Sequence, residues 1–380
     1  MIKKGFAYND VTIVPAIISN INSRSECNPI YSDGYLPIFA SCMSTVINDD
    51  NATEFIENKI NPIIPRNIHI SKRLFMAMNG FWVAMSMKEF EEYFINKANE
   101  RDFHCNYHIC IDIANGHMKS LYDLCVKAKE IARDIKYYKL TIMTGNIANP
   151  ETYKWICENA LFKDSTKIFD ECAIDYIRLS VGTGGQCVTS SNTGIHYPIA
   201  SLIHECNKIK IEIDVQYKLP KIVADGGIRN FNDVIKALAL GADYVMVGSL
   251  FAGMYESAAP LLIKKEPDNW SYEKFVEVDY KYENEEKKRM DIKNRPLWKE
   301  CYGMSTKKAQ ELIDPNKKKK TAEGKHSMIK VQYTIKQWTE NMIDYLKSAM
   351  SYCNAKELDD FIGKPEIIVN SPGTMMSVNK

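Results

Sequence analysis

Short apolar segments alternate with amphipathic segments along most of this chain, and this alternation limits the folds that it can adopt. Eight of the short segments are apolar and rich in β-branched or aromatic residues, as buried parallel strands are. These segments are residues 36–41, 61–65, 80–85, 107–114, 139–145, 174–180, 221–227 and 242–249. Apolar residues recur every three or four positions in the segments between them, most clearly at 118–134, 150–160, 199–209 and 231–240. The pattern predicts parallel strands joined by crossover helices.

Eight is the number of parallel strands that closes a barrel. An open, doubly wound sheet would show the same alternation, so periodicity alone does not choose between the two folds. Polar and glycine-rich residues follow several of the strands at the carboxyl end, where a barrel builds its site, and they favour the barrel. We therefore predict an α/β fold, a (β/α)8 TIM barrel, as a single domain over residues 1–380.

Three segments depart from the alternation. Residues 162–172 predict an extra loop or a short helix before the sixth strand. Residues 264–295 are strongly charged and predict a solvated β-hairpin or excursion outside the core. Residues from about 306 to 325 are expected to form a mobile loop. Its four consecutive lysines at 317–320 suit a solvated loop, although such a run could also attract a phosphate.

Charge and composition argue against several classes of function. The 49 Lys and Arg residues nearly balance the 48 Asp and Glu residues, so the whole chain has no electrostatic preference for nucleic acid or an anionic membrane. No run approaches the roughly 18 apolar residues that a membrane helix needs. Eleven cysteines without a CxxC pair, and an N-terminus without an apolar signal region, predict a reduced, cytoplasmic protein. The histidines form no HxH or HExxH pair, so no catalytic metal is expected.

A cysteine in a glycine-rich loop is the clearest sign of chemistry. Cys187 lies in the sequence VGTGGQCVTSSNTGIHY, between the sixth predicted strand and a predicted helix. Gly182, Gly184 and Gly185 let backbone atoms approach an ion closely, and N–H donors beside a thiol lower its pKa. Cys187 is therefore a candidate nucleophile. Position alone fits an inert packing cysteine equally well, since most cysteines are of that kind.

Two consecutive strands carry the elements of a nucleotide site. Asp225 ends the seventh strand, where a carboxylate can accept hydrogen bonds from both hydroxyls of a ribose, and Gly226 and Gly227 let the backbone come close. Gly248 and Ser249 end the eighth strand, where barrels commonly bind phosphate. Together these residues predict a ribose-phosphate ligand.

Two further strand ends carry polar residues. Asp112 and Asn146 follow the fourth and fifth strands, in the sequences DIANG and TGN. They could hold a second ligand at the same barrel mouth, or they could cap helices, as Asp and Asn often do. Glu323, in the sequence TAEGK, is ordinary by composition, and its default interpretation is a surface glutamate.

Taken together, these motifs resemble the family of purine nucleotide barrels that contains IMP dehydrogenase and GMP reductase. The resemblance covers most of the chain and follows an ordered set of stretches: YNDVTIVP, Ser23 with Arg24, ASCMST, IDIANG, IMTGN, VGTGGQCVT, IVADGGIRNFNDVIKALALGADYVMVGS, YGMST and AEGK. An ordered set of this kind is highly specific. It favours the interpretation of Cys187 as the nucleophile.

Two features favour the reductase branch of the family. Only an ordinary helix lies between the third and fourth strands, without room for the paired regulatory domains that are usual in the dehydrogenases. The segment between YGMST and AEGK is short and lacks the Arg-Tyr pair that activates water in those enzymes. The resemblance therefore implies the NADPH-dependent reductive deamination of GMP to IMP and ammonia, in purine nucleotide salvage and interconversion. The alternatives are an IMP dehydrogenase without regulatory domains and a non-catalytic nucleotide-binding barrel.

The resemblance also implies roles for individual residues. Cys187 would form a covalent thioimidate at C2 of the guanine, while Thr189 and Glu323 would relay the proton that lets ammonia leave. Nucleotide binding is implied for Ser41, Asp225, Gly226, Gly227, Gly248, Ser249, Gly303, Met304, Ser305 and Gly324. Cofactor binding is implied for Arg66, Asp112, Ile113, Ala114, Asn146, Val181 and Gly182, and for Ser23, Arg24 and Ser348 of a neighbouring subunit. Carbonyl groups of Gly182, Gly184 and Cys187 would hold potassium, and the shared cofactor site implies a homotetramer.

The chain departs from the reductase pattern at three places. Residues 43–45 read MST where the reductases usually have MDT, and Lys320 and Ala322 replace an arginine and a serine before Glu323. Gly185 stands where a phosphate-binding serine is usual. Loss of that hydroxyl removes one hydrogen bond worth about 0.5–1.5 kcal/mol, which backbone amides could offset. The changes near Glu323 bear on recognition of the base, so a modified guanine nucleotide is an alternative substrate.

Overall fold

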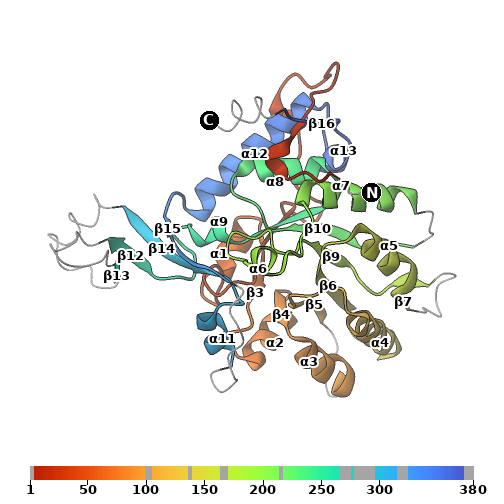
Figure 1. Ribbon diagram of the computed structural model, residues 1–380, viewed down its shortest axis with the longest axis vertical. Coiled ribbons are helices and arrows are strands. Elements are labelled where there is room, and N and C mark those ends of the chain that lie inside the picture. Colours follow the sequence, from red (N-terminus) through yellow and green to blue (C-terminus); the bar gives the residue numbers. More distant parts are fainter. Residues whose placement is uncertain are drawn as a thin grey trace.

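The structure, a computed structural model, describes residues 4–98, 105–135, 139–162, 170–213, 217–264, 275–277, 296–314 and 324–371. Its centre is a closed barrel of eight parallel strands with helices around it (Figure 1). In order around the barrel the strands are β2 (Ile38–Ala40), β3 (Asn61–Ile64), β4 (Trp82–Met85), β5 (Asn106–Ile111), β6 (Lys139–Ile147), β9 (Tyr176–Leu179), β10 (Lys221–Asp225) and β11 (Tyr244–Val247). β11 then pairs with β2 and closes the ring. All eight predicted strands and the predicted TIM barrel are confirmed.

Helices connect the strands and cover the outside of the barrel. They are α1 (Ala52–Glu57), α2 (Ile70–Met78), α3 (Met87–Glu91) with a π-helical turn η3 (Glu92–Asn96), α4 (Lys119–Ile135), α5 (Pro150–Asn159), α7 (Ile199–Glu212) and α8 (Phe231–Ala239). Asparagine side chains explain where two of them begin: Asn149 accepts a hydrogen bond from the N–H of Glu151, and Asn230 accepts one from Asp233. The four predicted crossover helices are confirmed, and α7 extends three residues beyond its predicted end.

Aromatic side chains fill the inside of the barrel below the site. Phe39, Trp82, Tyr176 and Tyr244 pack with ring centroids 5.0–5.8 Å apart. The Nζ atom of Lys221 lies 4.9–5.9 Å from the centroids of three tyrosine rings at this end, and burial lowers its pKa. The barrel is therefore a packed core rather than a channel.

Two aspartates brace neighbouring strands with the same arrangement. Asp175, just before β9, accepts hydrogen bonds of 2.7 Å from a backbone N–H of β6 and from Lys129 Nζ of α4. Asp243, just before β11, accepts hydrogen bonds of 2.7 Å from a backbone N–H of β10 and from Lys210 Nζ of α7. Each carboxylate thus joins its own strand to the neighbouring strand and to the helix that precedes that neighbour.

The two ends of the chain meet on the outside of the barrel. β1 (Val11–Ile13) pairs antiparallel with β16 (Ile367–Val369), beside the long helix α12 (Ile335–Tyr352) and the short helix α13 (Leu358–Phe361) (Figure 1). The 3-10 turn η1 (Tyr8–Asp10) precedes β1, and the turn η2 (Arg24–Glu26) packs against α12. Trp338 of α12 is fully buried and meets the ring of Phe251 at 4.7 Å between centroids.

A second, antiparallel sheet stands to one side of the barrel (Figure 1). Its strand order is β13 (Phe275–Glu277), β12 (Leu261–Lys264), β14 (Leu297–Tyr302) and β15 (His326–Lys330). The pairing of β12 with β13 agrees with a hairpin at the start of the charged segment 264–295, although most of that segment lies outside the described residues.

Two other segments differ from their predictions. The ends of 162–172 form short paired strands, β7 (Leu161–Phe162) and β8 (Glu171–Cys172), which the sequence analysis did not predict. Residues 163–169 lie outside the described part. Helix α11 (Lys307–Ile313), capped by Thr306, occupies the first half of the loop expected at 306–325, and residues 315–323 are not described. Whether this segment moves stays a prediction.

Candidate active site

A cavity of about 470 Å³ opens where the carboxyl ends of the barrel strands meet. Ser41 follows β2, Asp112 follows β5, Asp225 ends β10 and Gly248 follows β11, so a single mouth collects residues from across the chain. Most of the predicted site residues line it: Ser41, Arg66, Asp112, Ile113, Ala114, Asn146, Val181, Gly182, Gly184, Cys187, Thr189, Asp225, Gly226, Gly227, Gly248, Ser249, Gly303, Met304 and Ser305. The fold therefore brings together residues that are up to 264 positions apart in the sequence.

Four predicted residues of the described part are absent from the cavity lining. Gly324 is not part of the cavity lining, but it pairs with Cys187 in an antiparallel bridge directly beside it. Ser23 caps η2, Arg24 forms an ion pair of 3.3 Å with Asp344 of α12, and Ser348 lies on the same helix. These three residues gather on the outer surface, away from the cavity. Glu323 falls outside the described residues.

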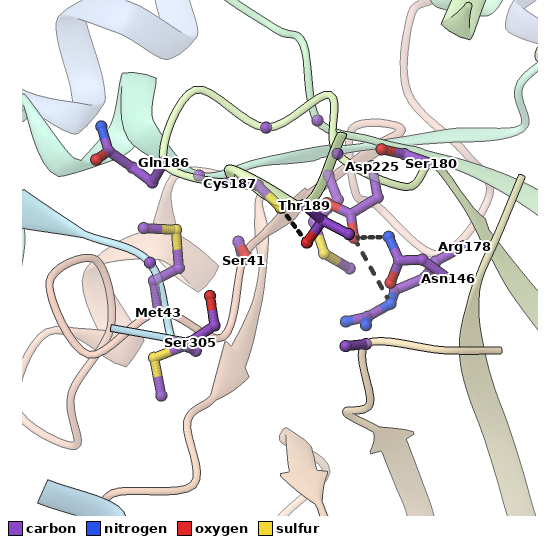
Figure 2. Close-up of a pocket in the computed structure, with 18 of the residues that line it drawn as sticks. Ser41, Met43, Asn146, Arg178, Ser180, Gln186, Cys187, Thr189, Asp225 and Ser305 are labelled. Carbon is purple, nitrogen blue, oxygen red and sulfur yellow. Dashed lines mark hydrogen bonds and ion pairs between the residues drawn. The ribbon is translucent and has the colours of Figure 1, made fainter. Parts of the chain in front are cut away.

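Cys187 projects from the loop between β9 and the short helix α6 (Thr189–Thr193) into the cavity (Figure 2). Its thiol donates a hydrogen bond of 3.2 Å to the hydroxyl of Thr189. Its backbone N–H donates to the carbonyl of Gly184 at 2.9 Å, which closes the glycine-rich loop on itself. The cysteine and the threonine of the predicted proton relay thus lie side by side.

A network of buried charges lies next to the cysteine (Figure 2). Asn146 donates a hydrogen bond of 2.7 Å to Asp225, and Nε of Arg178 lies 3.6 Å from the same carboxylate. Arg178 also lies 3.3 Å from Asp112. Burial raises the pKa of the Asp225 carboxyl, and Arg178 and Asn146 only partly oppose that rise. Asp225 is therefore held as a hydrogen-bond acceptor by its neighbours rather than by solvent.

Sequence analysis missed Arg178. It lies within the sixth strand, where the apolar pattern indicated core, yet an arginine inside such a strand needs a buried counter-charge, and that was the available signal. The cavity lining also includes Met43, Ser180, Gln186, Ile228, Met246 and Ile313, which had no assigned role. Apolar residues among strand ends give no signal that separates them from core.

The expected phosphate end of the cavity is built from glycines. Gly226 and Gly227 have φ values of 104° and 76°, where side chains are strained, and a Cβ at Gly226 would lie 2.9 Å from the Thr183 hydroxyl. A Cβ at Gly185 would meet only Ser249 Oγ, at 3.7 Å, which is ordinary contact. Gly185 therefore leaves open space, and its backbone does not require glycine.

The chemistry of the donors suits the predicted ligands. Arg66 lines the cavity, where its Nε lies 3.9 Å from the Glu89 carboxylate and its Nη1 donates a hydrogen bond of 3.4 Å to the carbonyl of Asp112. The carbonyls of Gly182 and Gly184 accept hydrogen bonds from Ser190 Oγ and Cys187 N–H, at 2.8 and 2.9 Å. A carbonyl oxygen has a second lone pair, so both could still coordinate a cation. Among the described residues, no group of three or more His, Cys, Asp or Glu side chains could hold a metal ion.

The fold and the site define a TIM-barrel protein whose cavity, at the carboxyl ends of the strands, is lined by glycine-rich loops and Cys187. The sequence pattern of the IMP dehydrogenase / GMP reductase domain matches residues 103–377, and the chain belongs to this family. A protein named GMP reductase from Staphylococcus carnosus is 28% identical over 97% of both chains. One of the same name from Bacillus thuringiensis is 30% identical over 77% of this chain and 83% of its own, and one from Helicobacter pylori is 28% identical over 78% and 84%. No helix in the described ranges is long and apolar enough to cross a membrane.

Proposed function

We propose that this protein reduces GMP, forming IMP and ammonia with NADPH as the hydride donor, and that it serves purine nucleotide salvage. The observation that carries the proposal is the position of Cys187, 3.2 Å from Thr189, in a cavity lined by Asp225 and the glycines of a nucleotide site. The names of the relatives support GMP as the substrate. The family also contains dehydrogenases, so the direction of the reaction rests on these names and on the short segment before Glu323.

In the proposed mechanism, the Cys187 thiolate adds to C2 of the guanine. Thr189 and Glu323 deliver a proton to the 2-amino group, which leaves as ammonia, and the C2–N bond breaks to give a thioimidate. NADPH, when bound, supplies the hydride that reduces C2. The C2–S bond then breaks, the thiol returns to Cys187, and IMP is released.

The nucleotide would lie across the β10 and β11 side of the cavity. Asp225 would accept hydrogen bonds from the ribose hydroxyls, because its carboxylate is already fixed by Asn146 and Arg178. Backbone amides at Gly227, Gly248 and Ser249 would bind the phosphate. Gly303, Met304 and Ser305 would complete the nucleotide site from the end of β14.

NADPH would lie on the opposite side, where its reactive ring meets Asp112, Asn146 and the Val181–Gly182 backbone. Arg66 lines this side of the cavity and would donate to the cofactor. The adenosine half would reach Ser23, Arg24 and Ser348 of a neighbouring subunit, which fits their position on the outer surface. A homotetramer would then be needed to complete each site.

The carbonyls of Gly182, Gly184 and Cys187 would hold a potassium ion that fixes the cysteine loop.

All eleven cysteines have free thiols, which suits a reducing, cytoplasmic environment.

Anaerobic incubation with GMP and NADPH, followed by assay of IMP and ammonia, tests the proposal. A parallel screen of modified guanine nucleotides tests which base is accepted.

Cys187→Ala should abolish turnover and leave GMP affinity nearly unchanged, because most affinity comes from ribose and phosphate contacts. Formation of XMP from IMP and NAD without GMP reduction would identify a dehydrogenase instead, and absence of both activities with retained GMP binding would identify a non-catalytic barrel.

A further inference from the structure

One carboxylate outside the cavity joins three elements that border the cysteine loop. Glu300 of β14 accepts hydrogen bonds from Lys308 Nζ of α11 at 2.5 Å and from His326 Nε2 of β15 at 2.5 Å. The Glu300 side chain is 18% exposed, whereas those of Lys308 and His326 are each 51% exposed. The three residues, which we call the Glu300 cluster, therefore connect a partly buried acid to two half-exposed bases.

The Glu300 cluster is packed on a buried aromatic ring. Tyr302, opposite His326 in the β14–β15 ladder, is 5% exposed. Its ring stacks with the imidazole of His326 at 6.2 Å and an interplanar angle of 19°, and Lys308 Nζ lies 5.1 Å from its centroid. Burial raises the pKa of Glu300, but the hydrogen bonds from Lys308 and His326 outweigh it, so the pKa lies below its ordinary value. The acid is thus charged and oriented by both partners.

The start of β15 supports the backbone of the cysteine loop. Gly324 pairs with Cys187, and the N–H of Lys325 donates a hydrogen bond of 2.8 Å to the carbonyl of Gln186. Ser327 accepts a hydrogen bond of 2.9 Å from the Gln186 amide. The end of β14 meets the same backbone, since a Cβ at Gly303 would lie 3.1 Å from the Gln186 carbonyl. Residues 186 and 187 therefore lie against the edge that β14 and β15 form.

We infer that Glu300 is a positioning residue for the active site. It holds β15 and α11 on β14, and so fixes the strand edge that orients Cys187 toward the cavity. The expected effect of this edge on turnover rests on the function proposed above. The expected effect of Glu300 on the order of the Lys325 backbone does not depend on that function. Neither Glu300 nor its two partners line the cavity, so the effect acts through the backbone alone.

Hydrogen exchange and kinetics on the full chain test this inference together. In Glu300→Ala, exchange at the Lys325 amide should rise by about tenfold or more, because loss of a charged hydrogen-bond acceptor frees the strand end. The kcat for GMP should fall by about tenfold with a smaller change in KM, because Glu300 itself lies outside the cavity lining. Glu300→Gln keeps the size and one acceptor and should give intermediate values. His326→Ala should shift both measurements in the same direction.

A matched control separates this role from general surface electrostatics. Lys119 and Asp123 form an exposed ion pair of 2.5 Å on α4, so Asp123→Ala removes a similar pair and should change neither measurement. Unchanged Lys325 exchange in a folded Glu300→Ala protein would overturn the inference, as would raised exchange with wild-type kcat. If the wild-type chain fails to reduce GMP, the proposed function fails, while the exchange measurement still decides whether Glu300 holds the strand edge.

Discussion

Arg178 controls the charge balance of the cavity at the scale of single residues. It is 4% exposed and lies between the carboxylates of Asp112 and Asp225. Without its guanidinium, two partly buried acids would lose their counter-charge, and unpaired charge away from solvent is costly. Arg178, which had no predicted role, therefore stabilises Asp112 and Asp225, the two acids that were predicted to belong to the site.

Arg178→Met should destabilise the protein in a pH-dependent way. The folded-state pKa of Asp225 is already raised, so its contribution to stability is present at low pH and is lost as pH rises through that pKa. Removing Arg178 raises this pKa further. We expect a loss of about 3–5 kcal/mol in unfolding free energy at about pH 7.5 that shrinks as the solution is acidified. Urea unfolding at about pH 7.5 and about pH 5 measures it. Arg133→Met, whose partner Asp134 is 67% exposed, is the control. An equal loss at both pH values would contradict this account.

Gly185→Ser should strengthen nucleotide binding. The open space around this position accepts a Cβ at ordinary contact distance, and the new hydroxyl can donate to a phosphate. One such hydrogen bond is worth about 0.5–1.5 kcal/mol, or about two- to twelvefold in GMP affinity. Calorimetric titration with GMP measures the gain, and guanosine serves as the control because it has no phosphate. A similar gain for guanosine would show that the phosphate does not lie beside residue 185.

At the scale of elements, the two aspartate braces show how short strands are kept in place. β9 and β11 have only four residues each, so few ladder hydrogen bonds hold them. Asp175 and Asp243 each add a charged hydrogen bond to the preceding strand and one to a helix. Both residues precede a tyrosine, in the sequences IDY and ADY, a recurrence that could have been noticed in the sequence.

Replacing either aspartate with asparagine should destabilise the barrel. Each substitution weakens two hydrogen bonds to a charged acceptor and removes the negative charge beside a mostly buried lysine, which costs about 1–3 kcal/mol. The costs should add in the double variant, because the two braces share no partner. Thermal and urea unfolding measure them, with the exposed Asp123→Asn as control. A double variant no less stable than either single one would show that the braces are coupled.

At the scale of the whole molecule, the outer face near η2 and α12 exposes apolar side chains. Ile17 is fully exposed and Ile18 is 76% exposed, and the adjacent backbone is tied to the end of α12 by a hydrogen bond from Ala16 N–H to the Tyr352 carbonyl. Ser23, Arg24 and Ser348 lie on these same elements. An apolar surface beside predicted cofactor residues is what a shared subunit interface would use.

Charging this face tests the proposed homotetramer. If it uses this face, Ile17→Asp with Ile18→Asp should reduce the molecular mass measured by light scattering, because buried carboxylates oppose association. The KM for NADPH should rise several-fold, while GMP binding should stay near wild type. The same pair of changes at Ile195 and Ile211, two exposed isoleucines elsewhere, is the control. An unchanged mass would place any subunit contact on another face.

Local sequence patterns were enough to predict the architecture and most of the cavity lining. Strand and helix periods reflect which face of each local segment is buried, and glycine, aspartate and serine mark strand ends by their local backbone and hydrogen-bond chemistry. The ordered motifs then indicated the family and placed Cys187, Thr189 and Asp225. These features depend on residues close together in the chain.

Three features were found in the three-dimensional structure and could not be predicted from the sequence. They are the contacts of Arg178, the pairing of residues 161–162 with 171–172, and the Glu300 cluster. Arg178 meets partners 66 residues before it and 47 after it, and Glu300 meets His326 across a strand ladder. Whether a charge is buried, and which charge it meets, depends on contacts between segments distant in sequence. Local sequence patterns do not predict contacts between distant segments. The residues that support the site were therefore identified only from the structure.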